Sequence, residues 1–245
     1  KLDLLKILFN KSCDITFENK TKTFNFTIIK LNSEDPEITS YFFKIIHLFI
    51  NKIGNEPDLV DVYKELNKML DLFSKGKKIS KNLVQGLFSE MVIINSSKNI
   101  DDQTEAWHNQ KTDRFDFNDS EVKIEVKSTS KYERIHKFRA SQLESKTPLF
   151  IASLLIIESG NGKTVLNLKD EIEKKLSKTT NKIKLNEVVL ETLGLKYLSS
   201  NRFKFDYNYC LENLLFFDLK NIPVIEKNFI PENYSKLSFE VDFTS

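Results

Sequence analysis

Three charged residues near the middle of the chain have the types and spacing of a metal-dependent hydrolytic site. Asp116 is followed nine residues later by Glu125, and Lys127 stands two residues after Glu125. Two carboxylates held close together in a partly buried place repel each other, and a hard divalent cation such as Mg²⁺ relieves this repulsion. The cation also lowers the pKa of a bound water and offsets charge that develops on a phosphate. Lys127 would then orient the water.

These side chains converge if residues 114–129 form a β-hairpin with an even-numbered loop. Strand residues alternate between faces, so an even loop places the apolar residues on one face and Asp116, Glu125 and Lys127 on the other. An ordinary hairpin with a solvated charged face has the same pattern. The register that we expect pairs Phe117 with Val122, Phe115 with Ile124 and Asp116 with Lys123.

The ordered set of residues around this hairpin resembles the PD-(D/E)xK nuclease superfamily. The resemblance is greatest to the bacterial PD-(D/E)xK motif proteins that are encoded in restriction and phage-defence clusters, and it covers about residues 80 to 170. Phe115 stands where the family name has a proline. The matching residues are Trp107, Arg114, Phe115, Asp116, Phe117, Ile124, Glu125, Val126, Lys127, Ser128, Thr129, Ile135, His136, Gln142 and Leu143.

The resemblance implies a fold, a cofactor and a set of site residues. The expected fold is α/β, with a restriction-endonuclease-like mixed sheet flanked by helices. Asp116, Glu125 and the carbonyl of Val126 would bind Mg²⁺, with Mn²⁺ as a substitute. Glu90, on a helix before the hairpin, would hold a metal-bound water or a second ion, and Gln142 would help to orient the site. From the residues alone, a boundary glutamate salt-bridged at the surface is the alternative for Glu90, and a surface glutamine is an equally good interpretation of Gln142.

A cluster of basic residues follows the hairpin. Residues 128–139 contain four Lys or Arg side chains and a histidine against one acid. Basic side chains beside a metal site are suited to a phosphate backbone, although solvated surface charge is the alternative. We expect DNA contacts from Arg114, Lys131, Arg134, His136, Lys137 and Arg139. Trp107, the only tryptophan, stands in an expected polar loop at 99–113, where a packing anchor is the favoured interpretation.

Composition limits the other classes of function. The 245 residues have a net charge of +2, which is too small to argue for nucleic acid without a local basic cluster. The two cysteines lie far apart, without metal-like spacing, and no apolar run has the length of a membrane span. We expect a cytoplasmic protein with reduced thiols and no membrane partner. Other restriction or defence subunits are expected partners, and a homodimer is left open.

Periodicity predicts three sections, at 1–75, 76–170 and 171–245. The first is an N-terminal β-plus-helix section, and the third is a C-terminal helical and β-rich extension that completes or extends the sheet. The resemblance implies that the second is the nuclease core. Helices are predicted at 37–52, 59–74 and 81–95, from either 167 or 170 to 176, and at 186–193. Strands are predicted at 15–17, 23–29, 149–158, 163–168, 203–209, 214–219 and 237–243.

The leading hypothesis is a Mg²⁺-dependent DNA endonuclease in restriction or anti-phage defence. The alternative is a catalytically inactive nuclease-fold subunit that binds DNA or assembles a defence complex. An enzyme acting on RNA is a third hypothesis, for which the sequence offers no RNA-specific motif.

Overall fold

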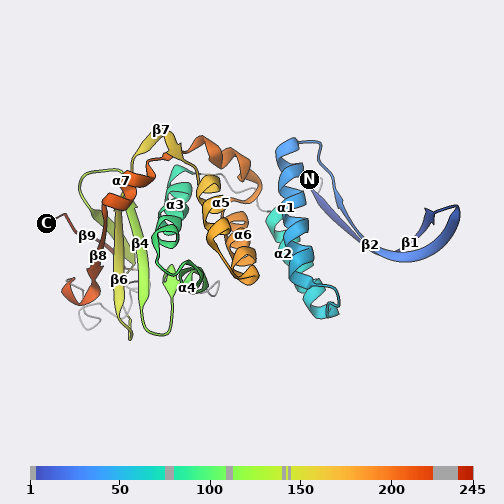
Figure 1. The fold of residues 1–245 in the computed structure, drawn as a ribbon, viewed down its shortest axis with the longest axis horizontal. Coiled ribbons are helices and arrows are strands. Elements are labelled where there is room, and N and C mark those ends of the chain that lie inside the picture. The colour runs from blue at the N-terminus through green and yellow to red at the C-terminus, as the bar shows by residue number, and fades with distance from the viewer. Residues whose placement is uncertain are drawn as a thin grey trace. The chain divides into compact units, whose positions relative to one another are not determined.

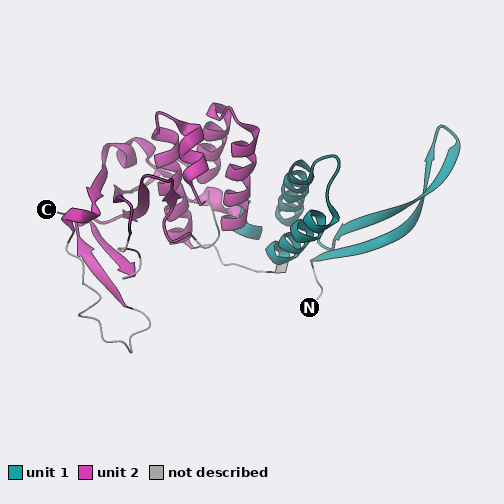
Figure 2. Ribbon diagram, turned by 90° about the horizontal axis from the view of Figure 1, so that it is seen from below, with its two compact units in different colours: residues 1–78, 193–198 teal, residues 79–192, 199–245 magenta. Residues whose placement is uncertain are grey.

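The structure is a computed structural model, and it describes residues 4–74, 80–108, 113–139, 142, 145–222 and 237–244. The chain divides into two compact units, which Figure 2 colours separately: residues 1–78 with 193–198, and residues 79–192 with 199–245. The predicted boundary between residues 75 and 76 and the matching residue Leu143 lie outside the described residues. Among the described helices, none combines the length and the apolar character needed to cross a membrane.

The first unit consists of a long hairpin and two helices. Strands β1 (Leu5–Phe17) and β2 (Lys20–Leu31) pair antiparallel, with an irregularity between Leu8 and Lys11. Helix α1 (Pro36–Ile53) starts after the cap residue Asp35, and α2 (Leu59–Ser74) packs on it, with the rings of Tyr41 and Phe73 5.3 Å apart. The 3₁₀ helix η2 (Gly194–Lys196) also belongs to this unit. The predicted strands and helices of this section are confirmed, with longer strands than expected.

The second unit is built on a mixed sheet with the strand order β3-β4-β6-β8. Strand β4 runs parallel to β6, while β3 and β8 are antiparallel to their neighbours. The apolar run predicted as a central strand forms β6, which is buried along almost all of its length. The α/β class with a mixed sheet is therefore confirmed. The bounds are β3 (Phe117–Asn118), β4 (Lys123–Thr129), β6 (Leu149–Leu155) and β8 (Leu214–Asp218).

Helices cover one side of this sheet. Figure 1 shows α3 (Lys81–Ser96) beside β4, with α5 (Val165–Lys175) on its far side. Helix α3 begins as predicted after Ser80, whose hydroxyl accepts a hydrogen bond from the Leu83 backbone N–H, and it is buried over most of its surface. The other helical segments of this region are α4 (Ile100–Ala106), α6 (Thr179–Leu193), η3 (Leu198–Arg202), α7 (Tyr207–Glu212) and η4 (Leu219–Asn221).

A second, two-stranded sheet packs on the face of β6 that bears Ile151. Strands β5 (Ile135–Arg139) and β9 (Ser238–Asp242) pair antiparallel. Their buried side chains form a hydrophobic cluster with the central sheet, made of Phe138, Ile151, Ile222, Val241 and Phe243. The C-terminal segment thus closes the core of this unit. The predicted division between residues 170 and 171 falls inside α5, and β8 and β9 belong to the same compact unit as the nuclease core.

Three local predictions were wrong at places where a capping residue starts a helix. The predicted strand at 163–168 is mostly the start of α5, since Thr164 and Asn167 form a capping box, and the preceding residues form β7 (Glu158–Lys163). The predicted strand at 203–209 makes only β-bridges at Phe205, and α7 begins after the cap residue Asp206. The expected polar loop at 99–113 contains α4, capped by Asn99.

Candidate active site

The turn between β3 and β4 sets the position of the site. Phe117 pairs with Ile124 and Asn118 with Lys123, so the predicted register was wrong by two residues. The side chain of Asp119 accepts hydrogen bonds from the backbone N–H groups of Glu121 and Val122, and this turn moves the pairing along the chain. A shift of two residues keeps each side chain on its predicted face.

Asp116 lies just before β3 and contacts the edge of β4 directly. Its Oδ2 accepts a hydrogen bond of 2.7 Å from the backbone N–H of Val126. The N–H and C=O of one strand residue project to the same side of the strand. The Val126 carbonyl therefore also points to the side of β4 where Asp116 lies, which is the side required by its predicted role as a ligand.

Glu125 is the most enclosed of the predicted site residues, with only 3% of its surface exposed. Its Oε1 accepts hydrogen bonds from Lys127 Nζ and from Gln142 Nε2, both at 2.6 Å. Gln142 is itself held by the backbone N–H of Arg139, which donates to its Oε1 at 3.0 Å. Gln142 is thus a direct partner of Glu125, and the interpretation as an isolated surface glutamine was wrong.

Glu90 enters the site from α3. Its Oε2 accepts a hydrogen bond of 2.8 Å from the indole Nε1 of Trp107, and it lies 2.9 Å from His108 Nε2. Trp107 is fully buried and pairs with Phe117 through a β-bridge. The tryptophan is therefore a packing anchor, as the sequence favoured, and it also fixes the carboxylate of Glu90 beside Asp116.

His108 is a site residue that the sequence analysis missed. One ligand atom each from Glu90, His108 and Asp116 lie within 4.8 Å of one another. The backbone N–H of His108 donates to the carbonyl of Asp116 at 2.9 Å, which ties the two segments together. The only sequence signal was the position of His108 directly after the anchoring Trp107, since no second histidine stands at a metal-binding spacing.

The cluster formed by Glu90, His108, Asp116 and Glu125 has an excess of negative charge. Burial raises the pKa of Asp116 well above its usual range, and the charges of Glu90 and Glu125 raise it further. Burial also raises the pKa of Glu125, although Lys127 acts in the opposite direction. For His108, burial acts to lower the pKa, but the hydrogen bond and charge of Glu90 outweigh it and raise the pKa. Crowded carboxylates of this kind fit a divalent cation with oxygen ligands, such as Mg²⁺ or Mn²⁺.

The residues predicted to contact DNA fall into two groups. Arg114, Lys131, Lys137 and Arg139 are exposed. Arg134 is only 7% exposed, and its guanidinium donates to the backbone carbonyls of Ser153 and Asn213, both at 2.8 Å. His136 is 4% exposed and lies 2.7 Å from Ser153 Oγ. The prediction was wrong for Arg134 and His136, because both side chains hold β5 against the central sheet.

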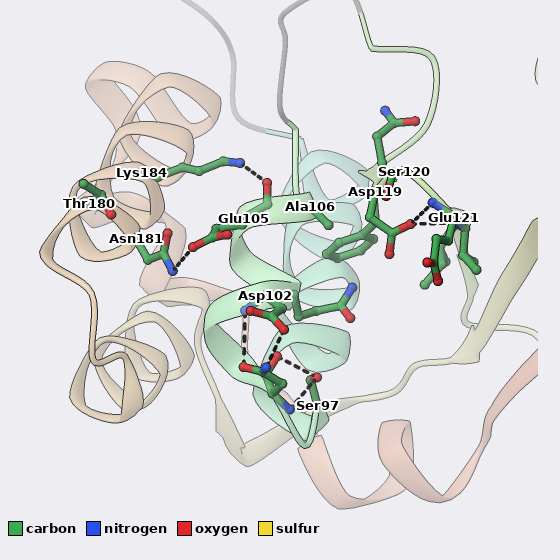
Figure 3. A pocket seen from close by; sticks show the side chains of 16 residues that line it. Ser97, Asp102, Glu105, Ala106, Asp119, Ser120, Glu121, Thr180, Asn181 and Lys184 are labelled. Carbon is green, nitrogen blue, oxygen red and sulfur yellow. Dashed lines mark hydrogen bonds between the residues drawn. The ribbon is translucent and has the colours of Figure 1, made fainter. Parts of the chain in front are cut away.

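A separate hollow of about 810 Å³ lies beside α4, α6 and the β3–β4 turn (Figure 3). Its polar lining includes Asp102, Glu105, Asp119, Glu121 and Lys184, and Lys184 Nζ donates to the Glu105 carbonyl at 2.7 Å. None of its lining residues is Asp116, Glu125 or Lys127. The hollow is therefore distinct from the cluster of carboxylates formed by Glu90, Asp116 and Glu125.

Comparison with known proteins agrees with this geometry. A family model described as "Putative PD-(D/E)XK family member, (DUF4420)" matches residues 4–244, which is almost the whole chain and more than the region of resemblance noted from the sequence. None of the curated proteins or solved structures compared with the chain matches it. The mixed sheet with its flanking helices is the restriction-endonuclease-like fold expected of such a protein. The chain therefore belongs to the DUF4420 family of PD-(D/E)XK proteins.

Proposed function

We propose that the chain is a Mg²⁺-dependent DNA endonuclease that hydrolyses phosphodiester bonds. The observations that support this most are the hydrogen bond of Asp116 to the Val126 N–H, the nearness of the Glu125 charge, which raises the pKa of Asp116, and the contact of 2.6 Å between Lys127 Nζ and Glu125 Oε1. Membership of a PD-(D/E)XK family supports the same assignment. Mn²⁺ is expected to replace Mg²⁺.

Each residue has a distinct task in the proposed reaction. Asp116, Glu125 and Glu90 would hold the cation, with the Val126 carbonyl as a further ligand. When bound, the cation supplies positive charge to the scissile phosphate and acidifies water. Lys127 positions the attacking water and stabilises the charge that develops as water adds to phosphorus in line with the departing sugar oxygen. Gln142 fixes the orientation of Glu125, and the Val126 N–H fixes that of Asp116.

The exposed Lys and Arg side chains near the site suggest where the DNA backbone lies. Lys137 and Arg139 project outward from β5, the strand whose inward residue Phe138 packs 5.1 Å from Lys127 Nζ. Lys131 and Arg114 are exposed on the segments that flank β4. We assign these four side chains to phosphate contacts, which position DNA without specifying its sequence.

The cellular setting of the proposed enzyme follows from the sequence resemblance alone. We propose a cytoplasmic role in restriction or anti-phage defence, with DNA as substrate and other defence subunits as partners. A homodimer is compatible with the proposal, since many double-stranded cuts need two active sites.

The alternative function is a DNA-binding or assembly subunit that has lost catalysis. Such a subunit has no need to crowd three carboxylates, whose mutual repulsion and burial disfavour the folded state. The hydrogen bonds from Lys127 and Gln142 to one oxygen of Glu125 also favour a working site over a structural remnant.

Incubation of unmodified DNA and RNA with the protein tests the proposal. With Mg²⁺ or Mn²⁺ the wild type should cleave DNA, and EDTA or the substitution Glu125→Gln should reduce cleavage at least about a hundredfold, since a metal ligand is lost. Cleavage of RNA in preference to DNA would transfer the proposal to RNA. Binding of DNA without cleavage under any metal condition would favour the inactive subunit.

A further inference from the structure

His108 lies beside the carboxylates of Glu90 and Asp116. Core packing does not require a histidine at this position. Its Nε2 lies 2.9 Å from Glu90 Oε2, and its side chain retains 36% exposure, so the ring is accessible from solvent. The neighbouring Trp107 already donates to the same oxygen of Glu90 at 2.8 Å. Glu90 is therefore oriented without the histidine, and the imidazole brings a second kind of donor atom to the site.

The distances in the cluster match those between ligands of one small cation. In an octahedral site with bonds of about 2.1 Å, adjacent ligand atoms are about 3 Å apart and opposite ones about 4.2 Å apart. Glu90 Oε2 and His108 Nε2, at 2.9 Å, have the separation of adjacent ligands. The ligand atom of Asp116 lies within 4.8 Å of the other two, close to the separation of opposite ligands.

The backbone holds the imidazole beside the second carboxylate. The N–H of His108 donates to the carbonyl of Asp116 at 2.9 Å, and the Trp107 side chain before it is fully buried. The two ring systems of Trp107 and His108 lie 5.4 Å apart. His108 also has a positive φ of 42°, a conformation that is uncommon for residues other than glycine. The ring is thus positioned from a rigid anchor.

We propose that His108 is a direct nitrogen ligand of the cation held by Glu90 and Asp116, which makes the site bind Mn²⁺ more tightly than the Mg²⁺ that it also accepts. Imidazole is a good ligand for first-row transition metals, whereas Mg²⁺ favours carboxylate, carbonyl and water oxygens. This inference rests on the proposed metal site and deepens it, because it concerns which ion the site takes. The competing explanation is that His108 only forms an ion pair with Glu90.

Pulsed electron paramagnetic resonance of the Mn²⁺-loaded full chain separates the two explanations without an activity assay. A directly bound imidazole nitrogen modulates the Mn²⁺ electron spin echo, and an ion-paired imidazole outside the coordination sphere does not. The variant His108→Gln removes the nitrogen ligand and keeps a polar side chain. The matched control is His47→Gln, since His47 is an exposed histidine of α1 that contacts Asn51.

The wild type and His47→Gln should show nitrogen modulation, and His108→Gln should lose it. Mn²⁺ affinity should fall at least about tenfold in His108→Gln, the loss expected even for an outer-shell partner, while Mg²⁺ affinity should change much less. Mn²⁺ bound to the wild type without nitrogen modulation, or modulation retained in His108→Gln, would overturn the inference and leave the proposed nuclease intact. Failure of the wild type to bind Mn²⁺ at all would overturn both.

Discussion

At the scale of single residues, the site is defined by what converges on Glu125. This carboxylate is almost fully enclosed, and one of its oxygens accepts both Lys127 and Gln142. Two donors that bind one oxygen of a carboxylate also fix the orientation of its other oxygen. A metal-binding carboxylate needs such a fixed orientation. Gln142 is thus a positioning residue whose effect is transmitted through Glu125.

Replacing Gln142 tests this role. Gln142→Ala should lower the DNA cleavage rate about 10- to 100-fold, the range typical for the loss of an outer-shell partner of a metal ligand, with little change in folding or in DNA affinity. The matched control is Gln85→Ala, since Gln85 donates to Ser128 Oγ at the neighbouring part of β4. Equal cleavage by the wild type and Gln142→Ala in steady-state assays would remove Gln142 from the site.

Asp116 leads to a prediction about stability. Its pKa is raised in the folded protein, so its charged form opposes folding. This penalty is absent below the unfolded pKa, near 3.8, and fully present above the raised folded pKa. Asp116→Asn keeps an acceptor for the Val126 N–H and should therefore raise the unfolding midpoint of the metal-free protein at neutral pH, with a smaller gain in acid.

Mn²⁺ provides the matching control in the same thermal unfolding experiment. At about 100 times its Kd, the ion should stabilise the wild type by about 2.7 kcal/mol, and Asp116→Asn should lose most of this gain. A variant that is less stable than the wild type without metal would show that the Asp116 charge is compensated in the folded state.

At the scale of elements, β5 separates structural from DNA-facing charge. His136 and Phe138 point inward, and Lys137 and Arg139 point outward, as the alternation of a strand requires. In the sequence, these residues and Arg134 have the pattern of one basic patch, because charge alone does not show which side chains are buried. The carbonyls of Ser153 and Asn213, which Arg134 satisfies, belong to segments far away in the chain.

Substitutions at Arg134 and Lys137 should therefore affect different properties, namely stability at Arg134 and DNA binding at Lys137. Arg134→Met should destabilise the protein by about 3 kcal/mol in urea unfolding, because buried carbonyls lose a charged donor. Lys137→Met should leave stability unchanged, weaken DNA binding and reduce the salt slope of log Kd by about one. A normal salt slope in Lys137→Met would exclude that lysine from the DNA path.

His136 gives β5 a pH dependence with a defined sign. Burial, with the charges of Lys127 and Arg134, lowers its pKa from 6.5 to about 4. The neutral ring is therefore compatible with the fold above the unfolded value of 6.5, and stability is lost as the pH falls from there towards the folded value of about 4. When the pH falls from about 7.5 to about 5, His136 should therefore lower the free energy of unfolding by about 2 kcal/mol.

Urea unfolding at these two pH values checks the prediction. The wild type and the control His47→Gln should lose about 2 kcal/mol more stability in acid than His136→Gln. The same acid loss in all three proteins would assign the pH dependence to other groups.

The elements that the sequence predicted well are those whose signal is local. The apolar run of β6, the capped start of α3 and the alternation in β4 were all visible in short windows. The alternating aromatic residues at 203–209 were assigned to a strand, although Asp206 caps a helix there. A helix cap satisfies free backbone N–H groups and can override a weak two-residue period.

At the scale of the whole molecule, the pairing of strands that lie far apart in the chain could not be predicted from the sequence. Strand β9 returns about a hundred residues after β5 to pair with it, and the cluster with Phe138, Ile151 and Phe243 closes the core. Asp116, Glu125 and Lys127 were identified because their spacing is local to one hairpin. His108 was not, because its approach to Glu90 and Asp116 depends on where α4 ends against β3.

In the proposed reaction, Lys127 acts on a phosphodiester at the Asp116–Glu125 site. The most direct test is cleavage of unmodified supercoiled plasmid with Mg²⁺ or Mn²⁺ by the wild type, Lys127→Ala and Lys123→Ala. Lys123 is the matched control, since it is a lysine on the same face of β4 whose Nζ lies over the Phe115 ring. DNA binding is measured for each protein under the same conditions.

We expect the wild type and Lys123→Ala to cut the plasmid, and Lys127→Ala to bind it with unchanged affinity while cutting at least about a thousandfold more slowly, as befits loss of a group that acts in the transition state. Cleavage by Lys127→Ala at the wild-type rate, or the absence of metal-dependent cleavage by the wild type, would rule out the proposed catalytic role of Lys127.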